Sequence, residues 1–305
     1  MNTVIAKIFG GLGNQLFCYA NAKRLAIVND ANLVLDTVSG FKYDFEYQRT
    51  YQLNKFNVDA KECTPKQRWE YTPFLNNFGL DSSRLYRKIA EGMNRNKQFG
   101  GRAYLKQESL DFDRRMLDLR ISGSVYLDGY WQSEKYFLDY TNIIRDDLRI
   151  TPPNDHTNQQ LADRILTCNA VALHVRFFED ESNRTQQNIA DNYYEKAISH
   201  LSSQFENLTF FVFSDQIDRA RRLINLPQDS VVYVNHNCND NMAYADLWLM
   251  TLCDHFIVAN STFSWWGAWL SDRTKKIVIA PDPIRMPVGN FWRTKDLIPV
   301  EWNLL

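Results

Sequence analysis

Residues 255–270, HFIVANSTFSWWGAWL, combine types that can bind an anion. An apolar, strand-like run at 256–259 leads without a linker into residues that favour a helix. Asn, Ser and Thr cap helices because their side-chain oxygens accept the first unpaired backbone N–H groups. A helix that begins directly after a strand also presents the positive end of its dipole. We therefore expect a cradle for a phosphate or pyrophosphate at Asn260, Ser261, Thr262, Phe263 and Ser264; a capped helix with a tryptophan-rich core face is the alternative.

Arg176 is a second candidate for binding an anion. It follows a predicted strand at 170–175, directly after His174 and Val175. A guanidinium is permanently charged and can bind a diphosphate through two N–H groups at once. A structural arginine–aspartate pair is the alternative that the sequence leaves open.

Asp246 is the one charged residue of an apolar helical segment, ADLWLM at 245–250. A lone carboxylate in such a segment needs a partner, a cap or a ligand. Guanine presents its N1–H and N2 amino group side by side, and a carboxylate accepts both. Asp246 is therefore a candidate guanine ligand, with an ordinary surface position as the alternative.

The glycine-rich segment GGLGNQ at 10–15 lies between a predicted strand and a predicted helix. It is neither a dinucleotide fingerprint, because Leu16 stands where Gly or Ala is required, nor a phosphate-binding P-loop, because Lys and Ser/Thr are missing. Glycine at such a turn permits positive φ and close approach of another molecule. Asn14 and Gln15 then offer amides suited to sugar hydroxyls; a tight structural turn is the alternative.

Asp111-Phe112-Asp113 has the spacing of the DxD motif of metal-dependent sugar transferases. It lies in a charged stretch within residues 40–120, whose weak periodicity does not define the order of elements. Because no predicted strand ends at this motif, we interpret it as coincidental and expect no metal site.

Composition excludes several classes of protein. A net charge of −1 over 305 residues gives no electrostatic basis for binding nucleic acid. The five cysteines show neither disulfide-framework nor zinc-ligand spacing. The first residues lack the apolar run of a signal peptide, and no stretch reaches the ~18 apolar residues of a membrane span. We expect a cytoplasmic protein.

Alternating strands and helices predict an α/β fold. The first segment predicts strand 3–9, helix 16–28 and strand 32–35, and from residue 170 onward strands and helices alternate regularly. The Pro152-Pro153 pair marks a boundary, so we expect domains at 1–155 and 156–305. Ligands bind beyond the carboxyl ends of such strands. The polar loops at these ends are 10–15, 174–181, 214–216 and 260–264.

Together these motifs resemble those of the bacterial α1,2-fucosyltransferases, a family of inverting glycosyltransferases. The resemblance extends in order over nearly the whole chain. It comprises GGLGNQLF at 10–17, YLDGYWQSEKYF at 126–137, HVR at 174–176, YYEKAI at 193–198, FVFSD at 211–215, DLWLM at 246–250, ANSTFSWWGAWL at 259–270, VIAP at 278–281 and IPVEW at 298–302.

The resemblance implies two Rossmann-like domains facing across a cleft, the GT-B arrangement. It implies GDP-β-L-fucose as the donor, no cofactor and no strict need for a divalent metal. The donor would be held by the C-terminal domain, including Ser214 and Asp215. A galactose-terminated glycan would be held mainly by the N-terminal domain, through Asn14, Gln15 and Trp131. A role in surface polysaccharide assembly, peripheral to the inner membrane, fits this family.

One motif departs from the family pattern His-x-Arg-Arg-Gly-Asp. Here Arg176 is kept, but Phe177 replaces the second Arg, Phe178 replaces Gly, and Glu179 stands where Asp is expected. Without a second arginine, only Arg176 and the helix start at 261–264 would stabilise the departing GDP. The phenylalanine pair is expected to narrow the acceptor side.

The same loop offers the general base that takes the proton of the acceptor hydroxyl. Its candidates are Glu179, Asp180 and Glu181, with Glu179 preferred. A fucosyltransferase of another linkage and a non-catalytic protein that binds nucleotide sugars or glycans remain alternatives. A dinucleotide oxidoreductase is disfavoured, because the required glycine turn is absent.

Overall fold

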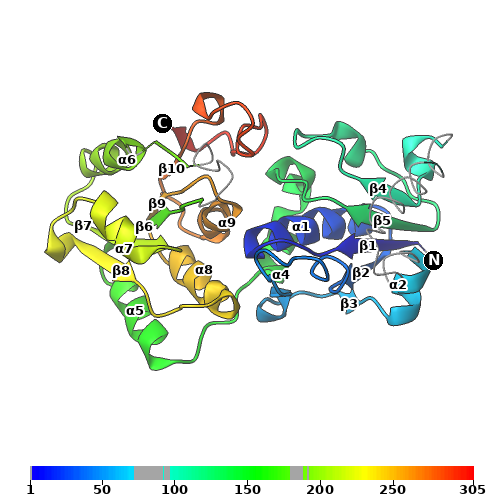
Figure 1. Ribbon diagram of the computed structural model, residues 1–305, viewed down its shortest axis with the longest axis horizontal. Coiled ribbons are helices and arrows are strands. Elements are labelled where there is room, and N and C mark those ends of the chain that lie inside the picture. The colour runs from blue at the N-terminus through cyan, green and yellow to red at the C-terminus, as the bar shows by residue number, and fades with distance from the viewer. Residues whose placement is uncertain (1, 72–91, 93–96, 179–187, 191) are drawn as a thin grey trace. The chain divides into compact units, whose positions relative to one another are not determined.

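The computed structural model describes residues 2–71, 92, 97–178, 188–190 and 192–305. It divides into two compact units, unit 1 at Met1–Leu148 and unit 2 at Arg149–Leu305, each built on its own sheet (Figure 1). The division lies before the Pro152-Pro153 pair, whereas the predicted domain boundary follows residue 155. Helix α4 (Thr141–Asp147) closes unit 1, and Leu148 after it is fully buried.

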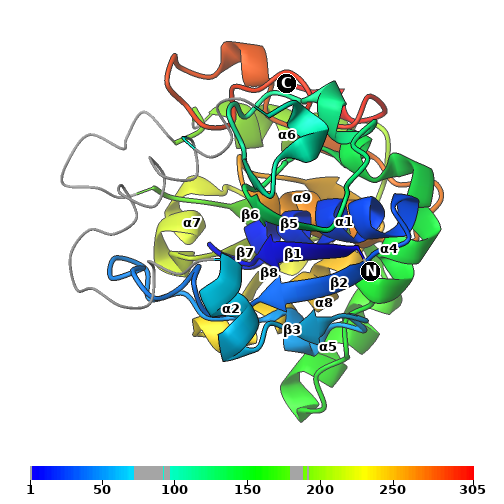
Figure 2. The same cartoon turned by 90° about the vertical axis from the view of Figure 1, so that its right-hand side faces the viewer.

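Unit 1 contains a five-stranded parallel sheet in the order β3-β2-β1-β5-β4. Figure 2 labels β3, β2, β1 and β5 of this sheet. Strands of parallel sheets are buried on both faces and therefore carry continuous apolar runs, such as the buried VIA at the centre of the first strand, TVIAK. Helix α1 (Leu12–Val28) packs on β1 and β2, and α2 spans Pro65–Tyr71. The strands are β1 (Thr3–Lys7), β2 (Asn32–Asp36), β3 (Lys61–Glu62), β4 (Tyr104–Lys106) and β5 (Ser124–Asp128).

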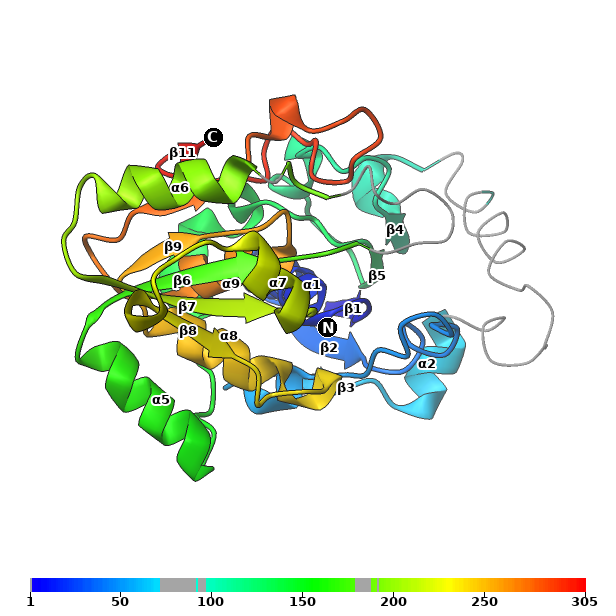
Figure 3. The same cartoon turned by 60° about the vertical axis from the view of Figure 1, so that its left-hand side comes forward.

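Unit 2 contains a six-stranded parallel sheet in the order β11-β10-β9-β6-β7-β8 (Figure 3). Its strands are β6 (Asn169–Val175), β7 (Leu208–Ser214), β8 (Val231–Val234), β9 (His255–Ile257), β10 (Val278–Ala280) and β11 (Asn303–Leu304). Its helices are α5 (His156–Leu166), α6 (Asn192–Ser202), α7 (Ile217–Leu223), α8 (Ala243–Thr251) and α9 (Thr262–Leu270).

Helix α9 buries a tryptophan face in the core of unit 2. Trp265 and Trp266 are fully buried, Trp269 is nearly so, and the ring of Trp302 packs 5.6 Å from that of Trp265. The indole N–H of Trp265 donates to the carbonyl oxygen of Leu297 at 2.8 Å. Burial of these large rings fixes the helix against the sheet, so the core face and the polar start of α9 occur together.

Both sheets reverse strand order at one point. In unit 1 the reversal lies between β1 and β5, and in unit 2 between β6 and β9. Loops on either side of such a switch point diverge and leave room for a ligand beyond the carboxyl strand ends. The segments that follow these four strands are therefore the places to look for a site.

Candidate functional site

Arg176 lies just beyond the carboxyl end of β6, at the switch point of unit 2. Its Nη1 forms an ion pair with Asp215 Oδ2 at 2.8 Å, and both side chains are about a quarter exposed (24% and 26%). Asp215 also accepts the backbone N–H of Phe177 at 3.2 Å. The arginine–aspartate pair that the sequence left open is thus present, and it orients a guanidinium that is still accessible to a ligand.

His174 and Ser264 connect β6 to the start of α9. His174 Nδ1 lies 2.9 Å from Ser264 Oγ, which also accepts the backbone N–H of Ala259 at 3.2 Å. Burial, helped by the positive charge of Arg176, lowers the pKa of His174 to about 3. The imidazole is therefore neutral near pH 7, and the buried Ser264 hydroxyl holds the turn together.

The start of α9 is capped as the sequence predicts. Ser261 is the N-cap, and its Oγ accepts the backbone N–H of Phe263 at 3.3 Å. Asn260 is fully buried, whereas Ser261, Thr262 and Phe263 are partly exposed. The ring of Phe263 lies 5.6 Å from that of His174. The positive end of the α9 dipole and the Arg176 guanidinium therefore flank the same switch point.

The two phenylalanines after Arg176 take different positions. Phe177 is buried, with the guanidinium of Arg219 4.1 Å from its ring centroid. Phe178 packs edge-on against Phe291 and lies 5.3 Å from the Arg176 guanidinium. Phe178 thus stacks beside the cation that the loop keeps. Glu179, Asp180 and Glu181 lie outside the described residues, so the predicted base is not located.

Asp246 lies in the first turn of α8, after β8. Asn237 Nδ2 donates to its Oδ1 at 2.8 Å, and Asn237 in turn exchanges two hydrogen bonds with Asn158, each 3.0 Å long. Asn158 is bound by Asp155, the N-cap of α5. Burial raises the pKa of Asp246 to about 7, against the opposing hydrogen bond from Asn237. Asp246 is thus held by a network of amides, at the same sheet edge as Arg176.

Ser214 lies at the end of β7, and its hydroxyl accepts the backbone N–H of Gln216 at 3.1 Å.

In unit 1 the glycine turn is tighter than the sequence suggested. Helix α1 begins at Leu12, not at residue 16, because only Gly10 has a positive φ, of 75°, and Gly11 is already the N-cap. A Cβ at Gly10 would lie 2.9 Å from the Tyr130 hydroxyl oxygen. Gln15 is fully buried, donates to the carbonyl oxygens of Gly10 and Thr50, and accepts the N–H of Gln52. Its amide therefore fastens the loop.

Asn14 and Trp131 lie on opposite sides of the unit 1 switch point. Asn14 is partly exposed, and its Oδ1 accepts from Gln132 Nε2 at 2.9 Å. Trp131 is 3% exposed and has a φ of 51°, which is unusual for a bulky residue. Gln107 Oε1 holds this backbone by accepting the N–H groups of Tyr130 and Trp131, at 2.8 and 3.1 Å.

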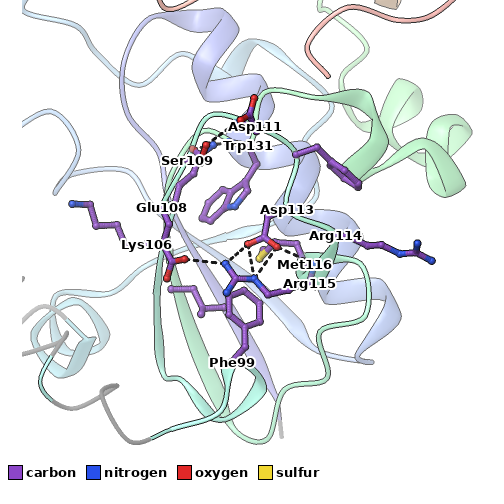
Figure 4. A pocket seen from close by; sticks show the side chains of 13 residues that line it. Phe99, Lys106, Glu108, Ser109, Asp111, Asp113, Arg114, Arg115, Met116 and Trp131 are labelled. Atoms are coloured by element: carbon purple, nitrogen blue, oxygen red, sulfur yellow. Dashed lines mark hydrogen bonds and ion pairs between the residues drawn. The ribbon is translucent and has the colours of Figure 1, made fainter. Parts of the chain in front are cut away.

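A cavity of about 320 Å³ opens beside Trp131 (Figure 4). The residues that line it come mainly from the segment after β4, a region that the sequence could not order. They include Asp111 and Asp113, and Arg115 binds the Asp113 carboxylate with N–O distances of 2.6–3.0 Å. This ion pair and the Asn237–Asn158 network are the features that sequence reasoning missed. The spacing of Asp113 and Arg115 was visible, but nothing in the sequence placed them beside Trp131.

Membrane-spanning helices and metal clusters are both absent from the described residues. None of their helices is long and apolar enough to cross a membrane. No group of three or more His, Cys, Asp or Glu residues among them could hold a metal ion.

Comparison with known proteins supplies independent findings. A family model described as "Glycosyl transferase family 11" matches residues 3–304. An alpha-1,2-colitosyltransferase of Escherichia coli is 32% identical, over 93% of this chain and 92% of the relative. The O-antigen biosynthesis glycosyltransferase WbnK of Escherichia coli is 26% identical, over 89% of this chain and 91% of the relative.

Among solved structures, a variant of Arabidopsis thaliana FUT1 in complex with GDP superposes with a TM-score of 0.54. It covers 95% of this chain and 72% of that chain at 15% identity, which is evidence for the fold alone. With two parallel α/β sheets, the fold is of the GT-B class, as the sequence predicted.

Proposed function

This chain belongs to glycosyl transferase family 11, and from that membership we propose that it transfers L-fucose from GDP-β-L-fucose to the 2-hydroxyl of a galactoside. The family, which includes α1,2-fucosyltransferases, confirms the resemblance drawn from the motifs. It makes the chain a glycosyltransferase that takes its sugar from a nucleotide donor. The donor, the acceptor and the linkage are the proposal.

The observation that carries the proposal is that Arg176 and the start of α9 follow β6 and β9, the two strands that border the switch point of unit 2. When the anomeric bond of the donor breaks, negative charge grows on the β-phosphate. Donors that are already in place stabilise this charge without reorganisation. Asp215 fixes the guanidinium, and the Ser261 cap and the Ser264 contacts fix the helix start. Asp246 binds the guanine edge through its carboxylate.

Transfer proceeds with inversion in this proposal. The acceptor oxygen attacks the anomeric carbon on the side opposite GDP, so a β-linked donor gives an α-linked product. A carboxylate in 179–181, with Glu179 preferred, takes the proton of the attacking hydroxyl. A cation such as Arg176, close to these residues in the chain, would favour the ionised form of such a carboxylate.

A specific observation favours a second candidate donor. The 32%-identical relative is named a colitosyltransferase, and colitose is L-fucose without its 3-hydroxyl. A site that hydrogen-bonds this hydroxyl would reject the deoxy sugar strongly, whereas a site lined by apolar groups there would accept both. The O-antigen relative supports a product in a surface polysaccharide. A location in the cytoplasm or peripheral to the inner membrane is part of the proposal.

The test is transfer with defined substrates. Purified protein is incubated with GDP-fucose or GDP-colitose and a panel of β-galactosides, and both free GDP and glycosylated product are measured. We expect GDP release that depends on the acceptor, and NMR of the product showing an α1,2 linkage. GDP-colitose as the better donor would select the second candidate. Tight GDP binding without turnover on any acceptor would instead indicate a non-catalytic nucleotide-sugar-binding protein.

A further inference from the structure

We propose that the cavity beside Trp131 is a binding site for a neutral sugar residue of the acceptor, next to the sugar that receives fucose. This inference rests on the proposed function and names a site for part of its substrate. The cavity belongs entirely to unit 1 and lies beyond the carboxyl ends of β4 and β5. Its volume of about 320 Å³ falls within the range of small-molecule sites, roughly 300–1,000 Å³.

The polar wall of the cavity is a chain of ion pairs. Arg115 donates through Nε and Nη2 to Asp113, and through Nη2 to Glu108 at 2.9 Å. Its guanidinium also packs 4.5 Å from the ring centroid of Phe99. Hydrogen bonds from Arg115 lower the pKa values of Glu108 and Asp113, so both stay ionised near neutral pH. A fixed cation between two carboxylates results.

This wall keeps hydrogen-bonding capacity toward a ligand. Among the described residues, Nη1 of Arg115 has no hydrogen-bond partner, and the side chain is half exposed. Each carboxylate has lone pairs beyond those that Arg115 uses. The N–H groups of Arg115 Nη1 can donate a hydrogen bond, and the neighbouring carboxylates can accept one. This combination suits two adjacent sugar hydroxyls, because each hydroxyl can both donate and accept. Figure 4 shows Arg115, Asp113 and Glu108 bonded together below the indole of Trp131.

The aromatic side of the cavity carries an unusual backbone. Trp131 is held at positive φ by Gln107, and a Cβ at Gly129 would lie 2.5 Å from Gln107 Cβ and 3.2 Å from the indole. A strained backbone that the surroundings enforce is characteristic of binding and catalytic sites. Trp131 is almost fully buried in the cavity lining, and Phe112 is a partly exposed ring of the same lining. Apolar ring atoms opposite a polar wall suit a sugar, which has C–H faces and hydroxyl edges.

The charge of the lining selects the class of ligand. Three acidic residues balance three basic ones: Glu108, Asp111, Asp113, Lys106, Arg114 and Arg115. In Figure 4 Lys106 and Arg114 point away from the other lining side chains. The remaining cation, Arg115, is bound by two carboxylates, and Asp111 adds a third acidic side chain to the lining. A phosphate would therefore meet no net positive charge, and a neutral sugar fits better.

The experiment compares Arg115→Ala with Arg114→Ala, its neighbour that points away. Kinetics use GDP-fucose with methyl β-galactoside, a monosaccharide acceptor, and with lactose and N-acetyllactosamine, which add a second sugar. We expect Arg115→Ala to raise the KM of the disaccharides about tenfold or more, with no change for methyl β-galactoside or for GDP affinity. Arg114→Ala should behave as wild type. Unchanged disaccharide KM values in Arg115→Ala would overturn the proposal.

Direct binding separates this proposal from the proposed function. Saturation-transfer NMR with lactose and N-acetyllactosamine, without any donor, should show binding to the wild type that is lost in Arg115→Ala and kept in Arg114→Ala. Glu108→Gln, at a side chain 59% exposed, should weaken the same binding without loss of folding. Binding by this pattern supports the site even if no fucose is transferred. Wild-type protein that binds neither disaccharide overturns the site, whatever the donor assay shows.

Discussion

The switch points of unit 1 and unit 2 have the same architecture, a strand followed by a tight turn and a helix, but they expose different side chains. At β1–α1 the turn is made by Gly10 at positive φ and is fastened by the buried amide of Gln15. At β9–α9 the turn is capped by Ser261 and is fastened by Ser264 to His174. In each case a buried polar side chain satisfies backbone or neighbouring groups. The residue that holds the turn is therefore distinct from those left exposed to a ligand.

The difference lies in what remains exposed. In unit 2 the Arg176 guanidinium, paired with Asp215 but still a quarter exposed, lies at the switch point that the start of α9 also borders. This edge therefore offers charged and backbone N–H donors, which suit a diphosphate. In unit 1 an amide, Asn14, and a charge-balanced cavity remain, so the edge suits a neutral polar ligand. Similar folds thus acquire different chemistry from a few residues that follow their strands.

The largest effect should come from removing the cation of unit 2. Arg176→Ala deletes charge stabilisation at the departing phosphate, which commonly costs ~3 kcal/mol or more in the transition state. We expect kcat to fall at least about 100-fold. The protein should stay folded, because the partly exposed ion pair with Asp215 contributes little to stability. Arg221→Ala, a cation on α7 that packs on Tyr233, is the matched control. Turnover of Arg176→Ala within threefold of wild type would remove Arg176 from the mechanism.

Loss of the base should rank next. Glu179→Gln is expected to lower kcat by roughly 10²-fold with a smaller change in KM, the pattern for lost proton transfer. Asp180→Asn and Glu181→Gln should have smaller effects. If one of these two is inactive instead, the base is in the loop but the ranking is wrong. If all three variants stay active, the base lies elsewhere.

Gln15 tests the closed turn of unit 1. Gln15→Ala leaves the carbonyl oxygens of Gly10 and Thr50 and the N–H of Gln52 without this partner. Buried groups left unsatisfied cost about 1–3 kcal/mol each, so we expect the free energy of unfolding to fall by about 3 kcal/mol. Asn14→Ala should cost less than about 1 kcal/mol, since its side chain is partly exposed. If denaturant titrations show that Gln15→Ala and Asn14→Ala lower the free energy of unfolding equally, the distinction between the buried residue that holds the turn and the exposed one is wrong.

Elements and site residues could be predicted from the sequence where the signal is local to a few neighbouring residues. The strands after residue 170 and the Ser261 cap were predictable because apolar runs and capping residues act over a few positions. The start of α1 was predicted too late, because glycines look like a turn even when only Gly10 needs positive φ. The Asn158–Asn237 contact joins segments far apart in the chain, and no local pattern encodes such a contact. The Arg115 cavity depends on how the segment after β4 folds against Trp131, in a region where the sequence has no clear periodicity.

Asp246 should give a smaller, pH-dependent effect. Its pKa of about 7 means that the carboxylate that accepts guanine is lost below neutral pH. GDP affinity, measured by calorimetry, should therefore weaken from pH 8 to pH 6, approaching tenfold per unit below the pKa. For folding the sign is opposite: the raised pKa favours the folded state below about pH 4, and this contribution is lost as pH rises through 7. Asp246→Asn should weaken GDP binding and abolish the pH dependence of that binding. Asp229→Asn, at the surface, is the control and should change neither. If Asp246→Asn keeps the wild-type pH profile, the role of Asp246 is purely structural.

The smallest expected effect is that of chelating divalent metals. It tests whether the candidate site at the carboxyl strand ends of unit 1 or of unit 2 depends on a metal. Arg176 and the start of α9 supply positive potential at the phosphate, a role that a divalent ion fills in metal-dependent transferases. In unit 1 the Asp113 carboxylate is already bound by Arg115. We therefore expect turnover in excess EDTA to equal that without it. Loss of activity that Mg²⁺ or Mn²⁺ restores would contradict this expectation, and Asp111→Asn and Asp113→Asn would then show whether the DxD spacing holds the metal. An unchanged rate would leave the two edges as inferred, with a built-in cation in unit 2 and a charge-balanced wall in unit 1.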